Sequence, residues 1–341
     1  MPARVLINSK WKTHQHTTGV QRYASELINA LGQTGMVFDE AAPQPGRVWR
    51  TTLWEQRVLP KLAEKYDTLV CPANMAPMNL SPDVNLILTV HCLRFHFHPE
   101  NYTRSFVNWY RFMIPRIIER ADTILTVSNT AAEQITDIYP QAKGKVEVLH
   151  PGVSPVFCPQ GITGDRAVSI QPYWVFIGNA APAKNLKILL EALSISKKGH
   201  RLVLLGVTQE QLDAMGVAYP RERVLALGHI NNTTRVASIL RGAIGLLAPS
   251  LYESFDLPTV EAMACGCTVL ASDIPVHREI AQDAPLYIPA SDASRWAYSM
   301  DQILTGSLSI EHHQELGINR ASRFRWEQAA RELVDIINRT P

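Results

Sequence analysis

Short runs of apolar residues recur along the chain, with helical patterns between several of them. They cover 5–7, 68–70, 86–90, 123–127 and 146–149 in the first half, and 174–177, 202–205, 224–227, 244–248 and 268–271 in the second. Runs of this length without polar alternation are typical of strands buried in a parallel sheet. Between the first two runs, Val20–Leu31 repeats apolar residues at the spacing of one helix face. The pattern predicts an α/β fold with parallel sheets covered by helices on both sides.

A change of pattern divides the chain. Residues 151–172 carry several prolines and glycines and no sustained periodicity, which favours a connection between domains. A chain of 341 residues also exceeds the usual size of a single core. We therefore expect two doubly wound domains at 1–160 and 161–320. Residues 321–341 should form a C-terminal helix, amphipathic over Ala329–Ile337, which could pack on either domain.

Composition narrows the function classes. Net charge is +2 without a concentrated basic stripe, which argues against nucleic acid as a partner. The five cysteines include no CxxC pair, so reduced thiols are expected rather than a zinc or redox site. The sequence shows no signal-peptide pattern and no apolar run of roughly 20 residues. We expect a cytoplasmic protein whose contact with a membrane, if any, is peripheral.

Two loops that precede helices are candidates for binding phosphate. Ligands of open parallel sheets bind where strands end and helices begin, because backbone N–H groups are exposed there and the helix dipole favours anions. Gly19 opens a helix after the first strand, although a glycine that only permits a tight turn explains it equally well. Gly178 follows the strand 174–177, and Lys184 stands before the next helix, either as a phosphate partner or as a solvated lysine.

A third loop carries two carboxylates. Glu253 lies after the strand 244–248, and Glu261 is expected in the first turn of the helix that follows, with Pro258 near its start and Gly266 at its end. Both carboxylates could accept hydrogen bonds from vicinal sugar hydroxyls. A favourable charge at the helix start, worth about 0.3–1 kcal/mol, would explain Glu261 but not Glu253.

With these motifs the chain resembles glycosyltransferase family 4, a family of retaining enzymes with the GT-B architecture, and in particular its bacterial mannosyltransferases. The resemblance rests on Glu253–Gly266, Gly178–Leu186 and Val148–Val153, with further similarity at 127–128 and 272–275. It implies two Rossmann-like domains that face each other across a cleft. It also implies transfer of a hexose from a nucleotide diphosphate sugar to a saccharide or lipid-linked saccharide, as in synthesis of bacterial surface polysaccharides or glycoconjugates.

The resemblance also implies roles for individual residues. Lys184 would neutralise the donor diphosphate, Glu261 would bind the ribose, and Gly19 would place N–H groups near the phosphates from the opposite domain. Glu253 would hold the transferred sugar, and His91, which follows the strand 86–90, would approach its reacting centre. The remaining donor-binding positions are Gly178, Ser254, Phe255, Asp256 and Leu257, the last three through their backbone.

Some positions depart from the family pattern. Cys92 stands after His91 where many relatives have Asp, and Asn179 and Ala183 stand where many have a second basic residue. Phosphate neutralisation would then depend mainly on Lys184 and helix dipoles, unless Arg94 or Arg278 reaches the site. The sequence contains no Asp-x-Asp motif, so we expect no metal and no other cofactor.

The acceptor and the donor are less defined. Residues 104–113 mix basic and aromatic side chains, which could lie on a membrane or pack into their own domain. GDP-mannose is favoured as donor, although UDP-sugar enzymes share these motifs. Rival hypotheses are a nucleotide-sugar epimerase or phosphorylase of the same architecture, or a non-catalytic sugar-binding protein. A nicotinamide dehydrogenase is disfavoured because the chain contains no Gly-x-Gly.

Overall fold

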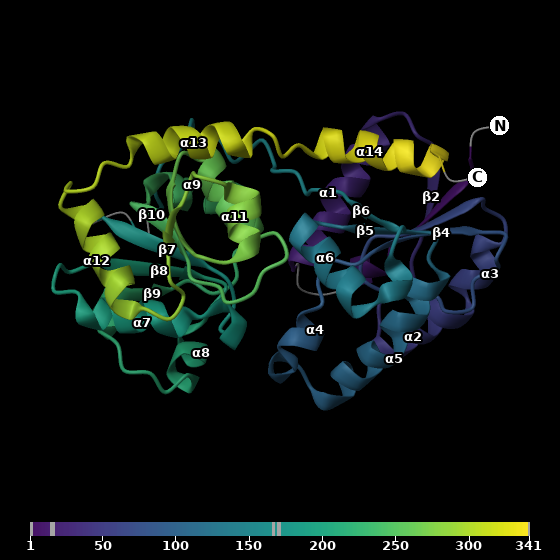
Figure 1. Ribbon diagram of the computed structural model, residues 1–341, viewed down its shortest axis with the longest axis horizontal. Coiled ribbons are helices and arrows are strands. Elements are labelled where there is room, and N and C mark those ends of the chain that lie inside the picture. The colour runs from purple at the N-terminus through teal and green to yellow at the C-terminus, as the bar shows by residue number, and fades with distance from the viewer. Residues whose placement is uncertain (1–2, 14–17, 166–167, 169–171, 340–341) are drawn as a thin grey trace. The chain divides into compact units, whose positions relative to one another are not determined.

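The protein is described from a computed structural model, which covers residues 3–13, 18–165, 168 and 172–339 (Figure 1). The chain forms two compact units. Unit 1 comprises 1–152 together with 325–341, and unit 2 comprises 153–324. Each unit contains a six-stranded sheet in which all strand pairings are parallel. The sheets have helices on both faces, which is the architecture of a doubly wound α/β fold.

The boundary between the units lies at Gly152 rather than at the expected residue 160. The segment after it belongs to unit 2 because backbone groups there are bound by that unit. The Gly164 N–H donates to the Ser238 carbonyl at 2.8 Å. The Arg241 guanidinium donates to the carbonyls of Cys158 and Ile162 at 3.0 and 2.9 Å. These contacts draw the chain between 153 and 164 onto unit 2.

The sheet of unit 1 has the strand order β2-β1-β3-β4-β5-β6. Its strands are β1 Val5–Asn8, β2 Phe38–Ala41, β3 Thr68–Cys71, β4 Asn85–Thr89, β5 Thr123–Thr126 and β6 Val146–Val148. Its helices are α1 Gly19–Gln33, α2 Val48–Arg57, α3 Leu59–Ala63, α4 Arg94–Phe97, α5 Arg104–Arg120, α6 Asn129–Ile138 and α14 Trp326–Arg339. Side chains of β1, β3, β4 and β5 that face α3, α5 and α6 form one continuous core.

The sheet of unit 2 has the strand order β12-β11-β10-β7-β8-β9. Its strands are β7 Tyr173–Ile177, β8 Arg201–Leu205, β9 Val224–Ala226, β10 Gly245–Ala248, β11 Thr268–Ser272 and β12 Leu286–Ile288. Its helices are α7 Leu186–Ile195, α8 Gln209–Ala214, α9 Thr233–Gly242, α10 Leu257–Ala264, α11 Pro275–Ala281, α12 Ala293–Leu304 and α13 Glu311–Ala321. Trp174 of β7 and Trp296 of α12 are fully buried in the core, which also contains side chains of α7.

The sequence pattern identified ten of these strands and missed two. The ten apolar runs correspond to β1, β3 to β6 and β7 to β11, and the helix expected at Val20–Leu31 is α1. The missed strands, β2 and β12, lie at the edges of their sheets. An edge strand needs less apolar sequence because one side of it is not covered by another strand, and in β2 the residues Asp39 and Glu40 are exposed.

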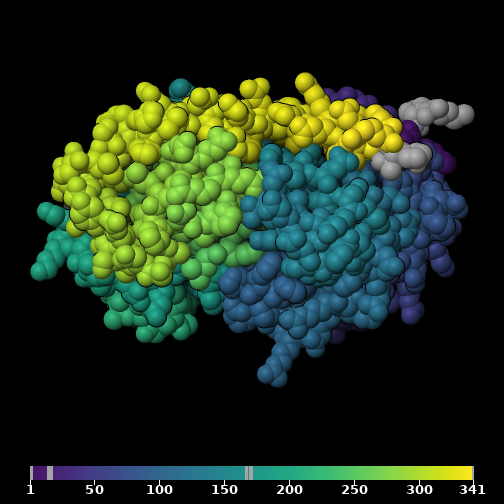
Figure 2. Space-filling view, in the orientation of Figure 1, coloured from purple at the N-terminus to yellow at the C-terminus, as the bar shows by residue number. Residues whose placement is uncertain are grey.

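Helix α14 lies on unit 1, where it packs along α1, and its yellow residues form part of the surface in Figure 2. The Trp326 ring meets Tyr23 of α1 edge to face, with 5.6 Å between centroids. A Cβ atom on Gly152 would lie 2.1 Å from the backbone nitrogen of Trp326, so only glycine allows the two chain segments to approach this closely. The end of unit 1 near β6 and the return of the chain at α14 are therefore packed together.

Candidate functional site

The strand order of unit 2 marks one place on its sheet as a binding site. The chain runs outward from β7 through β8 to β9 on one side, and from β10 through β11 to β12 on the other. Ligands of doubly wound sheets bind beyond the carboxyl ends of the strands at the point where this direction changes. In unit 2 that point lies between β7 and β10. The loops that follow these two strands carry Gly178–Lys184 and Pro249–Asp256.

Lys184 and Glu253 form an ion pair at this point. They lie 69 residues apart in sequence, and the Lys184 Nζ contacts the Glu253 Oε1. Both side chains are largely buried, with 14% and 7% of their surfaces exposed. The Ser250 hydroxyl donates to the same carboxylate oxygen at 2.7 Å. The fold thus brings a cation and a carboxylate from two separate sequence motifs into one partly desolvated position.

Asn185 fastens the two loops together, a role that the sequence analysis did not assign. Its backbone is left-handed, with φ of 52°, and it precedes the first residue of α7. Its side-chain amide donates to the carbonyls of Pro249 and Ala290, at 3.0 and 2.8 Å. Leu251 donates its N–H to the Ala183 carbonyl at 2.8 Å. Lys184 therefore projects from a short 3₁₀ helix, Pro182–Lys184, whose backbone is tied to the Glu253 loop.

Helix α10 begins and ends as its residues suggest. Asp256 precedes it in the left-handed conformation, with φ of 67°, and Pro258 occupies its first turn. Gly266 follows its end with φ of +71°. The Phe255 ring is buried against Phe324, with 5.3 Å between centroids, so this side chain is part of the core. Residues 255–257 lie at the start of α10. Backbone N–H groups at the start of a helix have no acceptor within the helix itself.

Glu261 lies deeper in α10 than expected. The helix starts at Leu257, so Glu261 is in its second turn and not in the first. The reason is that the left-handed Asp256 ends the loop early and lets the helix begin before Pro258. Glu261 is 2% exposed. The helix dipole stabilises carboxylates mainly in the first turn, so it does not explain a glutamate in the second turn. Ligand binding by Glu261 stays a prediction.

The glycine loops after β7, β8 and β9 are in contact with one another. The Gly178 N–H donates to the Leu205 carbonyl at 2.9 Å, and the Gly206 N–H donates to the Gly228 carbonyl at 2.7 Å. Gly206 has φ of +94°, and a Cβ there would lie 2.6 Å from the Gly178 carbonyl oxygen. These loops form a continuous backbone wall beside Lys184.

In unit 1, Gly19 and His91 also follow strand ends. Gly19 is the first residue of α1 after the N-cap Thr18, and no atom of the described part of the chain lies within 4 Å of where its Cβ would be. The His91 Nε2 is 2.8 Å from the Pro72 carbonyl oxygen, and its ring meets Tyr23 edge to face at 4.6 Å. Burial lowers the pKa of His91 to about 4, although the Pro72 hydrogen bond opposes the shift. His91 is accordingly a neutral imidazole whose Nε2–H donates to Pro72.

Arg278, one of the arginines considered as a second phosphate ligand, is occupied elsewhere. Its guanidinium binds both oxygens of Asp273, at 2.7 and 2.9 Å, and lies 3.8 Å over the Tyr287 ring. The other candidate, Arg94, opens α4 in unit 1. Lys184 of unit 2 therefore remains the cation proposed for the phosphates at the ends of β7 and β10.

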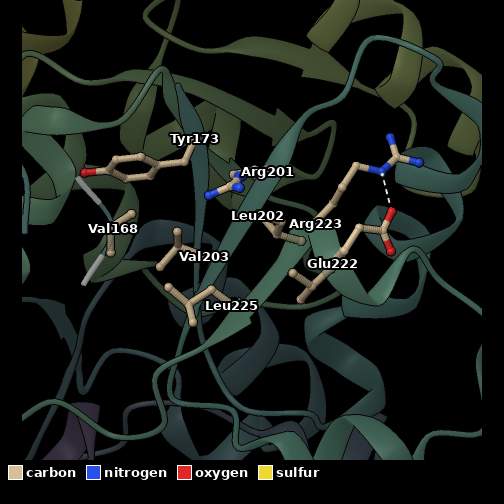
Figure 3. A pocket seen from close by; sticks show the side chains of 9 residues that line it. Val168, Tyr173, Arg201, Leu202, Val203, Glu222, Arg223 and Leu225 are labelled. Atoms are coloured by element: carbon tan, nitrogen blue, oxygen red, sulfur yellow. Dashed lines mark ion pairs between the residues drawn. The ribbon is translucent and has the colours of Figure 1, made fainter. Parts of the chain in front are cut away.

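A cavity of about 230 Å³ in unit 2 lies at the amino ends of the strands, whereas Lys184 and Glu253 follow the carboxyl ends (Figure 3). Its walls include Tyr173, Arg201 and Val224, which are the first residues of β7, β8 and β9. Figure 3 shows the ion pair of Arg223 and Glu222 beside it, with 3.7 Å between nitrogen and oxygen. The amino ends of parallel strands are not where doubly wound folds bind their ligands. We therefore do not assign the candidate site to this cavity.

Neither a membrane-spanning helix nor a metal-binding cluster occurs among the described residues. No helix there is both long and apolar enough to cross a membrane. Within the same residues, no three His, Cys, Asp or Glu side chains are grouped so that they could hold a metal ion. All five cysteines have free thiols.

Comparison with known proteins places this geometry in context. The family profile described as "Glycosyltransferase Family 4" matches residues 40–157, and the one described as "Glycosyl transferases group 1" matches 171–306. The chain is 26% identical over 250 residues to the O-antigen chain mannosyltransferase RfbU of Salmonella typhimurium, covering 72% of this chain and 67% of that protein. It is 22% identical to the O-antigen chain mannosyltransferase B of Escherichia coli, covering 73% and 69%.

A solved structure has the same fold. The sucrose-phosphate synthase of Thermosynechococcus elongatus superposes with a TM-score of 0.76 at 18% identity, over 99% of this chain and 98% of that one. At this identity the similarity shows the fold alone. Two parallel six-stranded sheets with flanking helices, in this order along the chain, match the GT-B architecture.

Proposed function

Because this chain belongs to the family 4 glycosyltransferases, we propose that it transfers a hexose from a nucleotide diphosphate sugar to a hydroxyl of a saccharide or lipid-linked saccharide. The observation that carries the proposal is the Lys184–Glu253 pair at the ends of β7 and β10. A diphosphate needs a fixed cation, and a sugar needs a carboxylate that accepts its hydroxyls. The structure supplies both at the expected position of a ligand.

The donor diphosphate is proposed to take Lys184 as its partner. The diphosphate carries more negative charge than Glu253, so it competes with Glu253 for the Lys184 ammonium group. The Glu253 carboxylate is then left to accept hydrogen bonds from the hydroxyls of the transferred sugar. Glu261 is proposed to bind the ribose, and the glycine loops around Gly178 and Gly206 to frame the base. From unit 1, Gly19 is proposed to offer N–H groups to the phosphates.

The reaction is proposed to proceed with retention at the anomeric carbon. The bond from this carbon to the phosphate oxygen breaks while the bond to the acceptor oxygen forms on the same face. The acceptor proton passes to a leaving phosphate oxygen. Negative charge grows on the diphosphate, and Lys184 together with helix N-termini stabilises it from fixed positions. His91, being neutral, is proposed to contact the sugar without opposing the positive charge that develops there.

Mannose is the proposed sugar and GDP-mannose the proposed donor. This proposal is supported by two relatives that are named O-antigen chain mannosyltransferases, at 26% and 22% identity. It also assigns the chain to synthesis of a bacterial surface polysaccharide or glycoconjugate. Because nucleotide sugars of this kind are made in the cytoplasm, that compartment is the proposed location.

One face of α5 is proposed to contact a membrane that carries the acceptor. The helix divides its aromatic residues: Phe106 and Tyr110 stack on each other at 4.1 Å and pack inward, whereas Trp109 and Phe112 are 38% and 46% exposed. Arg116 lies 3.8 Å over the Phe112 ring. Exposed aromatic rings beside arginines suit the interface of an anionic bilayer.

Two experiments test these proposals. Incubation with GDP-mannose and other nucleotide sugars should release a nucleoside diphosphate together with a glycosylated product, and an isomerised donor without a glycosylated product would contradict transfer. For the membrane, a Trp109→Ser and Phe112→Ser double variant should lose co-sedimentation with anionic liposomes. Tyr298→Ser, which changes a 56% exposed ring in unit 2, is the matched control. Wild-type protein that ignores the liposomes would remove the membrane proposal only.

A further inference from the structure

A second ion pair lies directly behind the Glu253 loop, and nothing in the sequence motifs assigns it a role. The His277 Nε2 is 3.2 Å from the Asp256 Oδ2. His277 is completely buried and Asp256 is 7% exposed. The Thr259 hydroxyl donates to the same aspartate oxygen at 2.5 Å. Burying two charged groups costs desolvation free energy unless further hydrogen bonds compensate for it. The hydrogen bonds around this pair therefore show which parts of the structure it connects.

The contacts of the His277 ring favour protons on both of its nitrogens, because each nitrogen faces an oxygen atom. Nδ1 lies 2.8 Å from the Ser272 carbonyl oxygen, and Nε2 faces the Asp256 carboxylate. A neutral imidazole has one N–H, so deprotonation would place a lone pair against one of these oxygens. Burial acts to lower the pKa of His277, but the hydrogen bond and charge of Asp256 outweigh it and the pKa is raised. In turn, the hydrogen bond and charge of His277 lower the pKa of Asp256 to about 2, although burial acts to raise it.

The pair is connected to the Lys184–Glu253 pair through a short chain of hydrogen bonds. The Ser272 hydroxyl, at the end of β11, donates to the Ser250 carbonyl at 2.5 Å. The Ser250 hydroxyl in turn donates to Glu253 at 2.7 Å. The charged groups that face the pair are Glu253 and Lys184 from the loops after β10 and β7. Arg278, next to His277 in α11, is engaged with Asp273.

Asp256 occupies a backbone conformation that residues other than glycine rarely adopt. Its φ and ψ are 67° and 68°, and it directly precedes α10. Aspartate tolerates this region better than most residues, and here its carboxylate is held by two side chains from outside the loop. The direction of the backbone at the start of α10 therefore depends on where the Asp256 carboxylate is held.

We propose that the His277–Asp256 pair is the positioning element of the donor loop. By anchoring the Asp256 carboxylate, it directs the backbone amides around 255–257 and the Glu253 carboxylate toward the transferred sugar. The inference rests on the proposed function of this loop. It assigns His277 an effect on the sugar moiety of the donor and not on the nucleoside diphosphate, which is held by Lys184, Glu261 and the glycine loops.

The test compares binding of a nucleoside diphosphate with binding of the matching nucleotide sugar, by calorimetry or thermal shift. Two ligand pairs are available: GDP with GDP-mannose, and UDP with UDP-glucose. The comparison uses the pair that the wild-type protein binds more tightly. Asp256→Asn removes the charge but keeps a side chain that tolerates a left-handed backbone. His277→Gln removes the cation. Arg278→Gln, at the adjacent exposed position, is the control.

Asp256→Asn and His277→Gln should each weaken binding of the nucleotide sugar about tenfold, raise the donor KM accordingly, and leave the affinity for the nucleoside diphosphate within about twofold. In wild type, the extra affinity for the nucleotide sugar should fall as the pH rises through the His277 pKa, whereas in His277→Gln it should not change with pH. Arg278→Gln should behave as wild type.

Equal affinity of wild type and both variants for the nucleotide sugar would overturn the inference, and so would an equal loss for both ligands. Should a variant fail to fold, Asp256→Gly replaces it, because glycine adopts the left-handed backbone without strain and only the carboxylate is lost. Asp256→Gly should show the same tenfold loss, and wild-type affinity in this variant would overturn the inference. A wild-type protein that binds none of the four ligands would remove the proposed function, and the inference with it.

Discussion

Each unit of this protein has a buried histidine just beyond its sheet, and the pKa values of these two histidines, His91 and His277, are shifted in opposite directions. His91 of unit 1 is 6% exposed and faces a backbone carbonyl and the Tyr23 ring, and burial lowers its pKa to about 4. His277 of unit 2 is also buried, but it faces the Asp256 carboxylate and its pKa is raised. Burial alone favours the neutral form in both. The partner that the fold supplies decides the outcome.

The difference suits the chemistry proposed for each unit. Unit 2 gathers charged groups, Lys184, Glu253, Asp256 and His277, where a diphosphate and a sugar are expected to bind. Unit 1 offers a neutral imidazole whose Nε2–H is bound to Pro72, so that its Nδ1 can accept a hydrogen bond near a sugar that develops positive charge. A protonated His91 would repel that charge. The predictions below test this contrast.

The largest effect is expected from Lys184→Ala. Removing the cation that faces the leaving diphosphate should lower kcat by about 10³-fold, the range seen when a fixed electrostatic group is lost from an active site. It also removes the cation that compensates the charge of the buried Glu253, which should cost about 3–5 kcal/mol of unfolding free energy. Steady-state kinetics and urea unfolding measure the two effects.

Lys187→Ala is the control for Lys184→Ala. Lys187 is the second residue of α7, its side chain is 64% exposed, and it pairs with Glu191 at 3.6 Å. Its loss should leave kcat unchanged and alter stability by no more than about 0.5 kcal/mol. Near-normal turnover of Lys184→Ala would exclude this lysine from the mechanism.

The second effect is a pH dependence of stability with opposite signs at the two histidines. The pKa of His91 is lowered from 6.5 to about 4, so its contribution is present above pH 6.5 and is lost as the pH falls toward 4. The shift corresponds to about 3 kcal/mol. The pKa of His277 is raised, so its contribution is present below 6.5 and is lost as the pH rises through the raised pKa.

Urea unfolding at a series of pH values separates the two contributions. His91→Phe should flatten the loss of stability between pH 6.5 and 4, whereas His277→Gln should flatten the loss above pH 6.5. If His91→Phe kept the full acid slope, the neutral state assigned to His91 would be wrong.

The third effect concerns the role of His91 in transfer. His91→Phe keeps an aromatic ring against Tyr23 but removes both ring nitrogens, and kcat should fall about a hundredfold if one of them hydrogen-bonds near the reacting centre. The KM for the donor should change little. A fall in apparent kcat that only tracks the loss of folded protein, measured by circular dichroism, would assign His91 to packing alone.

The smallest effect is expected from metal removal. Since Lys184 and helix N-termini are proposed to stabilise the diphosphate, treatment with EDTA should leave turnover unchanged within error. Activity that disappears with EDTA and returns with magnesium or manganese would show that a metal shares the task proposed for Lys184.

Much of the fold could be predicted from residue patterns. Ten of the strands were predicted from apolar runs, because a strand covered on both faces must be apolar along most of its length. Helix α10 was indicated by Pro258 near its start and Gly266 after its end, since each has a conformation that suits its position. The edge strands β2 and β12 escaped prediction because their burial is incomplete and their sequences are short or polar.

The site divides in the same way. The residue types at Lys184, Glu253 and Glu261 were readable in the sequence, because motifs place chemistry at fixed distances from strand ends. Their contacts were not. The pairing of Lys184 with Glu253 depends on β7 and β10 lying side by side, which is decided by strand order and not by local pattern.

The sequence alone determined which segments become strands and helices and where polar chemistry follows a strand, since both depend on near neighbours along the chain. Only the tertiary structure decided that His277 meets Asp256, that Asn185 ties two loops together and that His91 is neutral. These outcomes depend on groups distant in sequence that share a desolvated space, where one partner sets the charge of the other.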